Sequence, residues 1–130
     1  MRKLFIAMAV IEMVTGLGLI VSPPMLAWLL LGSQLDAPAA IIVARIGGVA
    51  LLSLGTACWF ASRDENSRAA AGVMAAMVLY NCGATILLAY AGIAQGLSGL
   101  GLWPAVLVHT VLAVGSIASV KSRTTSMLIK

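Results

Sequence analysis

The sequence predicts an all-α integral membrane protein, a four-helix bundle that forms a single domain over residues 1–130. Three observations predict it. The composition is 62% hydrophobic and 9% charged, whereas soluble domains carry about 25% charged residues. Four apolar stretches approach the roughly 20 residues that a helix needs to cross a bilayer. These runs are continuous rather than alternating, and helices pair every backbone polar group internally. The composition excludes a soluble enzyme, a nucleic-acid-binding module and a disordered chain.

The four expected spans each contain one conspicuous polar residue. The spans cover residues 4–22, 39–61, 69–94 and 104–120, and they enclose Glu12, Arg45, Asn81 and His109 in that order. The first stretch is longer than the apolar region of a secretory signal, which has about 7 to 15 residues, so we expect it to be a span.

Proline and glycine punctuate the connection after the first span. Pro23 and Pro24 end the first helix, because proline lacks the amide hydrogen that a helix interior needs. We expect a short helix over Met25–Leu31 that ends at Gly32, since glycine commonly terminates helices. It is too short to cross a bilayer and is expected to lie at the interface.

The basic residues are distributed unevenly. Seven of the eight fall on one side of a four-span arrangement: Arg2, Lys3, Arg63, Arg68, Lys121, Arg123 and Lys130. The connections on the other side carry one charge, Asp36. Positive residues favour the cytoplasmic side. We therefore expect a multi-pass protein of a bacterial inner membrane with both termini in the cytoplasm.

Aromatic residues are expected to form belts at the two membrane interfaces, where amphipathic rings are enriched. The outer belt would contain Trp28, Tyr90 and Trp103, and the inner belt Phe5, Trp59 and Phe60. Glycines in the second span, with Gly48 and Gly55 on one face, favour close helix packing. The seven methionines suit flexible core filling.

Polar residues inside the spans are the candidate ligand-binding residues, because a charge at mid-span costs about 2.5–3.5 kcal/mol and usually faces the bundle interior. The set is Glu12, Arg45, Asn81, His109 and Tyr80. Helical rise places Arg45 and His109 at one depth and Glu12 and Asn81 about 5–10 Å deeper. A direct ion pair between Glu12 and Arg45 is one expectation. Side chains lean toward the helix N-terminus, which would direct these two apart, so the sequence does not decide whether the pair forms.

Two other interpretations of these residues remain. They could serve only as interhelical hydrogen bonds, and Tyr80 could be a packing residue with a satisfied hydroxyl. His109 as a metal or haem ligand is disfavoured, because the chain has no second histidine and no cysteine pair at ligand spacing. No catalytic residue and no metal site are expected.

Two families show a resemblance. The segment Ala9–Gly16, with its carboxylate Glu12, resembles the first helix of small multidrug resistance transporters. Arg45 and the complete charge bias depart from that family, and it is disfavoured. The longer resemblance is to small four-helix bacterial membrane proteins of the DoxX-like group. It rests on Glu12–Gly16, Pro23–Pro24, Trp28–Gly32, and Arg45 with Gly48 and Gly55. That resemblance implies a small membrane protein. Most members of the group are uncharacterised, and a few are linked to quinone-dependent redox complexes or to redox-enzyme maturation.

The sequence therefore predicts an intramembrane polar pocket that binds a quinone or a lipid-like amphiphile, or an accessory subunit of a membrane redox complex. Arg45 would supply a fixed cation, Glu12 or His109 would exchange protons, and Asn81 would orient the ligand. One alternative is a proton-coupled transporter that uses Glu12. The other is a structural or assembly subunit without a pocket. An enzymatic activity is not expected. The partners would be the lipid bilayer and either a redox complex or further copies of the chain, and not a nucleic acid.

Overall fold

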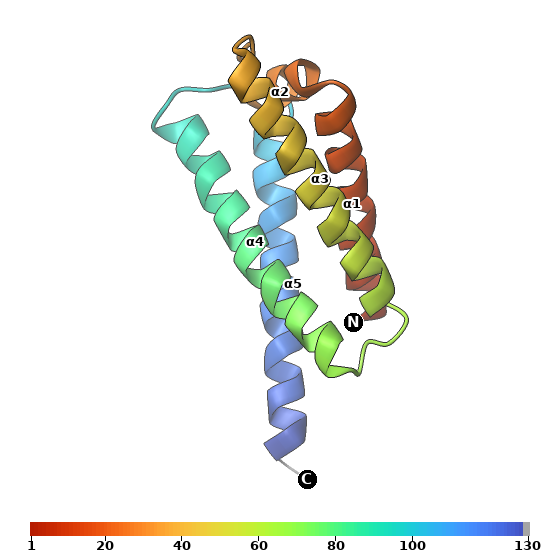
Figure 1. The fold of residues 1–130 in the computed structure, drawn as a ribbon. Helices are drawn as coiled ribbons and strands as arrows, with labels where there is room; N and C mark the ends of the chain where they lie inside the picture. Colours follow the sequence, from red (N-terminus) through yellow and green to blue (C-terminus); the bar gives the residue numbers. More distant parts are fainter. Residues whose placement is uncertain (129–130) are drawn as a thin grey trace.

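The computed structural model describes residues 1–128, with side chains described through Lys121. It contains five helices and no strand among these residues. The helices are α1 (Arg2–Val21), α2 (Pro23–Leu31), α3 (Pro38–Ala61), α4 (Arg68–Ile93) and α5 (Leu102–Leu128). The four long helices form an elongated bundle, and α2 lies across one end of it (Figure 1).

Four helices are long and apolar enough to cross a membrane: α1, α3, α4 and the part of α5 from Leu102 to Lys121. Their bounds agree with the expected spans to within two residues. The helix α5 continues to Leu128, beyond its apolar part. Lys130 lies outside the described residues, and Arg123 lies in α5 without a described side chain.

The helices pack mainly in two antiparallel pairs, α1 with α3 and α4 with α5. Small residues bring the first pair together. A Cβ atom on Gly16 would lie 2.7 Å from the backbone oxygen of Gly48, and a Cβ on Gly48 would lie 2.7 Å from that of Gly16. A Cβ on Gly55 would lie 3.0 Å from the Ala9 oxygen. The expected close-packing role of Gly48 and Gly55 is confirmed, because each lets the α1 backbone approach where a side chain would not fit.

The short helix α2 confirms the expected helix after the first span, two residues longer at its start. Pro23 and Pro24 occupy its first turn, where the missing amide hydrogen costs nothing. Gly32 ends it in the left-handed conformation with φ of 66°. The backbone amide of Gly101, after α4, donates to the Leu29 oxygen at 2.8 Å. A Cβ on Gly99 would overlap the backbone of Leu30, so α2 and the α4–α5 connection are in close contact.

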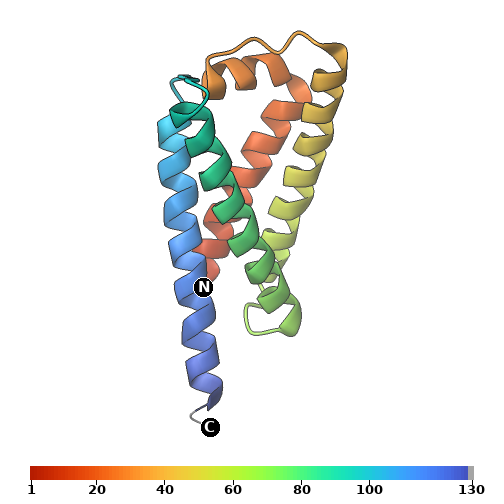
Figure 2. The ribbon, with the colours of Figure 1, turned by 90° about the vertical axis from the view of Figure 1, so that its left-hand side faces the viewer.

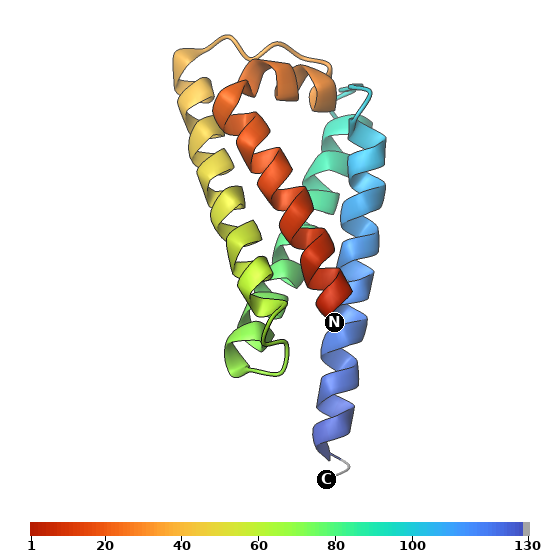
Figure 3. The ribbon, with the colours of Figure 1, turned by 90° about the vertical axis from the view of Figure 1, so that its right-hand side faces the viewer.

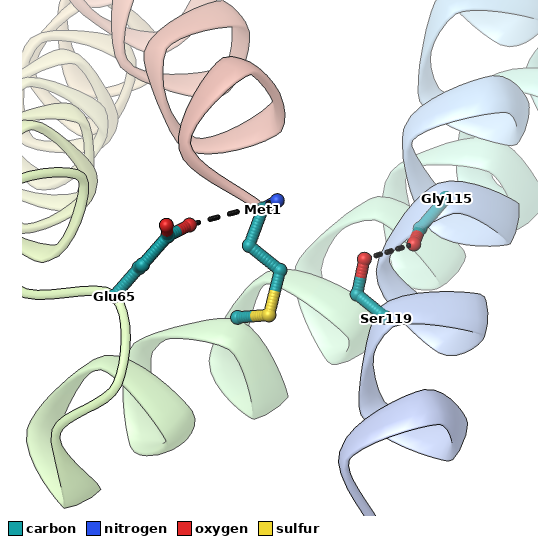
Figure 4. Close-up of polar contacts among 4 residues, drawn as sticks. All are labelled: Met1, Glu65, Gly115 and Ser119. Atoms are coloured by element: carbon teal, nitrogen blue, oxygen red, sulfur yellow. Dashed lines mark hydrogen bonds and ion pairs between the residues drawn. The ribbon is translucent and has the colours of Figure 1, made fainter. Parts of the chain in front are cut away.

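We call the two extremities of the bundle the α2 end and the Met1 end. The Met1 end also holds the connection between α3 and α4 (Figures 1 and 2). The amino group of Met1 lies 3.6 Å from the Glu65 carboxylate of that connection, as Figure 4 shows. The guanidinium of Arg63 lies 5.5 Å from the ring centroid of Trp59, within the range of a cation–π contact.

A continuous core fills the half of the bundle nearer the Met1 end. It draws on all four long helices, with Phe5, Met8, Cys58, Met74 and Met77 completely or almost completely buried. The expected core-filling role of methionine is confirmed for three of the seven, since Met8, Met74 and Met77 are at most 1% exposed.

The aromatic side chains differ from the expected belts at one position. Trp28, Tyr90 and Trp103 are more than half exposed near the α2 end, and Phe60 is exposed near the Met1 end. Phe5 is 0% exposed. Its expected place at the interface is wrong, because the side chain turns inward at the point where α1 meets the other three long helices.

Candidate functional site

A cavity of about 800 Å³ lies in the half of the bundle nearer the α2 end. All five helices contribute to its wall, which includes Thr15, Leu19, Leu30, Leu51, Leu87 and Val108. Its volume falls within the roughly 300–1,000 Å³ of small-molecule sites. Figure 3 shows α1 and α5 moving apart toward the α2 end, with α2 across the top. The cavity follows from this divergence, because the side chains of the two helix pairs no longer meet there.

Two polar side chains of the cavity wall lie side by side. Tyr80 and His109 both line the cavity, from α4 and α5, and Thr15 lines it from α1. The rings of Tyr80 and His109 meet edge to face, with centroids 5.6 Å apart and planes at 79°. The remaining wall is almost entirely aliphatic. A polar head group placed here would therefore have its hydrogen-bonding partners at one place and apolar side chains elsewhere.

Asn81 supports His109 from behind the cavity wall. Its side chain is 0% exposed, and its Oδ1 lies 2.9 Å from His109 Nδ1. Its Nδ2 donates to the Met77 backbone oxygen at 2.8 Å. The amide thus joins two helices and holds the imidazole in one orientation. The sequence predicted different depths for Asn81 and His109. Their side chains still meet, because the two side chains together are long enough to bridge that difference in depth.

Glu12 is buried near this group without a hydrogen-bond partner. The residue is 1% exposed, and neither carboxyl oxygen forms a hydrogen bond with the described residues. The Tyr80 hydroxyl is close enough to interact electrostatically with the carboxyl group. A buried polar group without a partner is costly, so this carboxyl requires an explanation other than packing.

Arg45 does not join the group. Its side chain is exposed, whereas Gly48, three residues later on α3, is buried against α1. At 100° per residue, three residues separate two side chains by about 60° around the helix, enough to direct Arg45 away from the interior. It forms no ion pair with Glu12, and the expectation that both face one interior site is wrong.

The structure therefore brings together four of the five predicted residues: Glu12, Tyr80, Asn81 and His109. Two further polar residues had no role in the sequence analysis: Thr15 lines the cavity, and Ser116 is buried against Met8 of the core. Thr15 lies three residues after Glu12, and Ser116 lies seven after His109, and both spacings place a side chain on the same helix face. Ser116 is completely buried and donates to the Met8 sulfur at 3.8 Å. The helical spacing was the signal that would have found them.

Comparison of the chain with models of protein families, with curated proteins and with solved structures found no match in any of the three. The site is therefore interpreted from its geometry. Within the part of the chain that has described side chains, no three metal-binding side chains cluster. The arrangement offers an apolar chamber, an oriented imidazole, a phenol and a nearby carboxyl. It suits the binding of an amphiphile with a small polar head.

Proposed function

We propose that this protein is a multi-pass membrane protein that binds a single-headed amphiphile, such as a quinone or a lipid, in the cavity. The observation that carries the proposal is the cavity itself, about 800 Å³, whose polar wall groups Tyr80 and His109 lie together. The head group would contact these residues and the tail would occupy the aliphatic remainder. Binding could serve a membrane redox complex as an accessory subunit, in line with the resemblance to DoxX-like proteins.

The proposed location is a bacterial inner membrane, with the Met1 end in the cytoplasm. Large apolar side chains are exposed along all four long helices, among them Val14, Val43, Leu79 and Val111. Such surfaces are unfavourable in water and suit contact with lipid. The basic residues Arg2, Lys3, Arg63 and Arg68 occur at the Met1 end, which agrees with positive residues on the cytoplasmic side. The α2 end would face outward.

Cysteine labelling tests this topology. In a chain with Cys58 and Cys82 replaced by alanine, single cysteines at Asp36 and Asp64 should react with impermeant maleimides from opposite sides of the membrane. Equal accessibility of both positions from one side would contradict the proposed four-span arrangement.

Occupancy of the cavity is tested by filling it. Gly83 and Gly72 both lie in α4, and a Cβ added to either meets nothing within 4 Å. Only Gly83 lines the cavity. We expect lipid or quinone to co-purify with the wild type and with Gly72→Leu, and to be lost from Gly83→Leu, as measured by mass spectrometry of organic extracts. Equal ligand content in the two variants would overturn the proposal.

A second candidate function is proton-coupled transport through Glu12. The observation that favours it is the carboxyl that is 1% exposed and lacks a hydrogen-bond partner, since an ionisable group at such a place is a functional candidate. Proteoliposomes with a lipophilic cation, tetraphenylphosphonium, should then show proton flux that Glu12→Gln abolishes. Absence of any Glu12-dependent flux would exclude this candidate.

The third candidate is a structural or assembly subunit. The Asn81–His109 hydrogen bond favours it, because it links α4 to α5 without needing a ligand. This candidate predicts that Gly83→Leu leaves all bound molecules unchanged. Native mass spectrometry from mild detergent would show in one measurement whether a ligand, a protein partner or a second copy of the chain accompanies the protein.

A further inference from the structure

The hydrogen bonds around His109 restrict which head group the cavity can bind. The backbone oxygen of Met77 can only accept a hydrogen bond. The Asn81 side chain meets this oxygen at 2.8 Å, so its amino group must face Met77. The amide oxygen must then face His109, whose Nδ1 lies 2.9 Å away.

An amide oxygen cannot donate, so the hydrogen of this contact must be carried by His109 Nδ1. A neutral imidazole with a hydrogen on Nδ1 has a lone pair on Nε2. No carboxylate bonds to the imidazole among the described residues, and we take the ring as neutral here. Nε2 itself forms no hydrogen bond with those residues, and His109 lines the cavity.

Tyr80, which meets His109 edge to face, presents an oxygen atom. Thr15, the other hydroxyl of the wall, can donate or accept. The Tyr80 hydroxyl is close enough to the Glu12 carboxyl to interact with it electrostatically, and that carboxyl has no hydrogen-bond partner among the described residues. A hydroxyl hydrogen turned toward that carboxyl leaves the phenol oxygen to accept from a ligand. Among the residues with described side chains, no Lys or Arg lines the cavity, and Arg45 is exposed on the outside of α3.

We infer that the cavity selects a neutral amphiphile whose head group donates a hydrogen bond, a phenol or a quinol, over its acceptor-only or anionic counterpart. This inference rests on the proposed amphiphile-binding function and specifies its ligand class. A hydroxyl group would donate to His109 Nε2. A carbonyl or ether oxygen would meet the same lone pair without a hydrogen between them, and a carboxylate would lose its hydration with no cation to replace it.

Three probes with the same ring and tail separate these outcomes: 4-dodecylphenol, 4-dodecylanisole and 4-dodecylbenzoate. Binding to the purified full chain would be measured by titration in mild detergent. We expect the phenol to bind about fivefold more tightly than the anisole, as one added neutral hydrogen bond provides, and the benzoate to bind most weakly. Equal binding of phenol and anisole, or tighter binding of the benzoate, overturns the inference but leaves the cavity as an amphiphile site. Binding of none of the three overturns the inference and the proposed function together.

The tautomer can be observed directly without a substitution, because His109 is the one histidine of the chain. With ¹⁵N-labelled histidine and a purification tag free of histidine, we expect a protonated Nδ1 and an unprotonated Nε2. The Nε2 resonance should shift on addition of 4-dodecylphenol and not of 4-dodecylanisole. A proton found on Nε2 in the free protein would refute the inference, whatever the affinities.

Discussion

The two halves of the bundle are filled differently, although the same four long helices build both. Toward the Met1 end, Phe5, Met8, Met74 and Met77 are at most 1% exposed and form one core. Toward the α2 end, a cavity of about 800 Å³ separates the helices. Both halves are lined by apolar side chains, so apolarity does not decide where the interior closes. The separation of the helix axes decides it.

The small residues of α1 and α3 explain this separation. The backbones of Gly16 and Gly48 lie in close contact. Closer to the Met1 end, Gly55 lets the backbone of Ala9 approach α3. These contacts hold α1 against α3 over most of its length, so α1 follows α3 rather than α5. The pair α1–α3 consequently diverges from the pair α4–α5 toward the α2 end, as Figures 2 and 3 show. The helix α2 crosses the resulting space and supplies Leu30 to the cavity wall.

The largest expected effect tests this contrast within one helix. Met77 and Leu79 both lie in α4, but Met77 is 0% exposed in the core whereas Leu79 is 77% exposed and touches the cavity. We expect Met77→Ala to lower the free energy of unfolding by about 2–3 kcal/mol, since it leaves a void in a packed core. Leu79→Ala should cost less than about 0.5 kcal/mol. Denaturant titration in mixed micelles measures both, and equal losses would contradict the difference between the halves.

The next effect concerns the glycine contact. A Cβ on Gly48 would lie 2.7 Å from the Gly16 oxygen, whereas a Cβ on Gly47 meets nothing within 4 Å. We expect Gly48→Ala to destabilise the bundle by about 2 kcal/mol, because the backbone of α1 must move away. Gly47→Ala, the matched control, should be neutral or slightly stabilising, as alanine favours helix over glycine. The same unfolding measurement applies, and a neutral Gly48→Ala would show that α1 is not held where we describe it.

The helices themselves were largely predictable from sequence. Each long apolar run corresponds to a helix, and the apolar parts of these helices agree with the expected bounds to within two residues, although α5 continues to Leu128. Gly32 ends α2 as expected. These features depend on local chemistry: hydrophobic length, proline at a helix start, and glycine in the left-handed conformation. The inward position of Phe5 was not predictable in this way, because it depends on which neighbours α1 meets.

The candidate site was predictable in part. Residue type identified Glu12, Asn81 and His109, since polar groups in apolar spans are rare. Rise along the helix gave their depths, but not the rotation of each helix about its axis. That rotation places Arg45 on the exposed side. The cavity depends on the divergence of two helix pairs, which no segment of the sequence encodes by itself.

A smaller effect is expected for the hydrogen bond that lies between the two halves. Asn81 and His109 are joined at 2.9 Å, and buried interhelical hydrogen bonds in membrane proteins contribute about 0.6 kcal/mol on average. A double-mutant cycle with Asn81→Leu and His109→Phe should give a coupling energy near that value. The cycle cancels the interactions of each side chain with its other neighbours, so the coupling energy reports the pair alone. A coupling energy of zero would show that the two side chains do not interact in the folded bundle.

The smallest effect is expected at Arg45, which does not line the cavity. The side chain is exposed and begins about 10 Å along α3 from its first residue, Pro38. In the proposed topology this lies within reach of the membrane surface, toward which a long basic side chain can extend. We expect Arg45→Gln to change the free energy of unfolding by less than about 0.5 kcal/mol and to leave the amount of co-purified ligand at the wild-type level. A loss of ligand in this variant, with stability unchanged, would mean that the guanidinium reaches the cavity after all, and that the preference for a neutral head group has to be abandoned in favour of an anionic one.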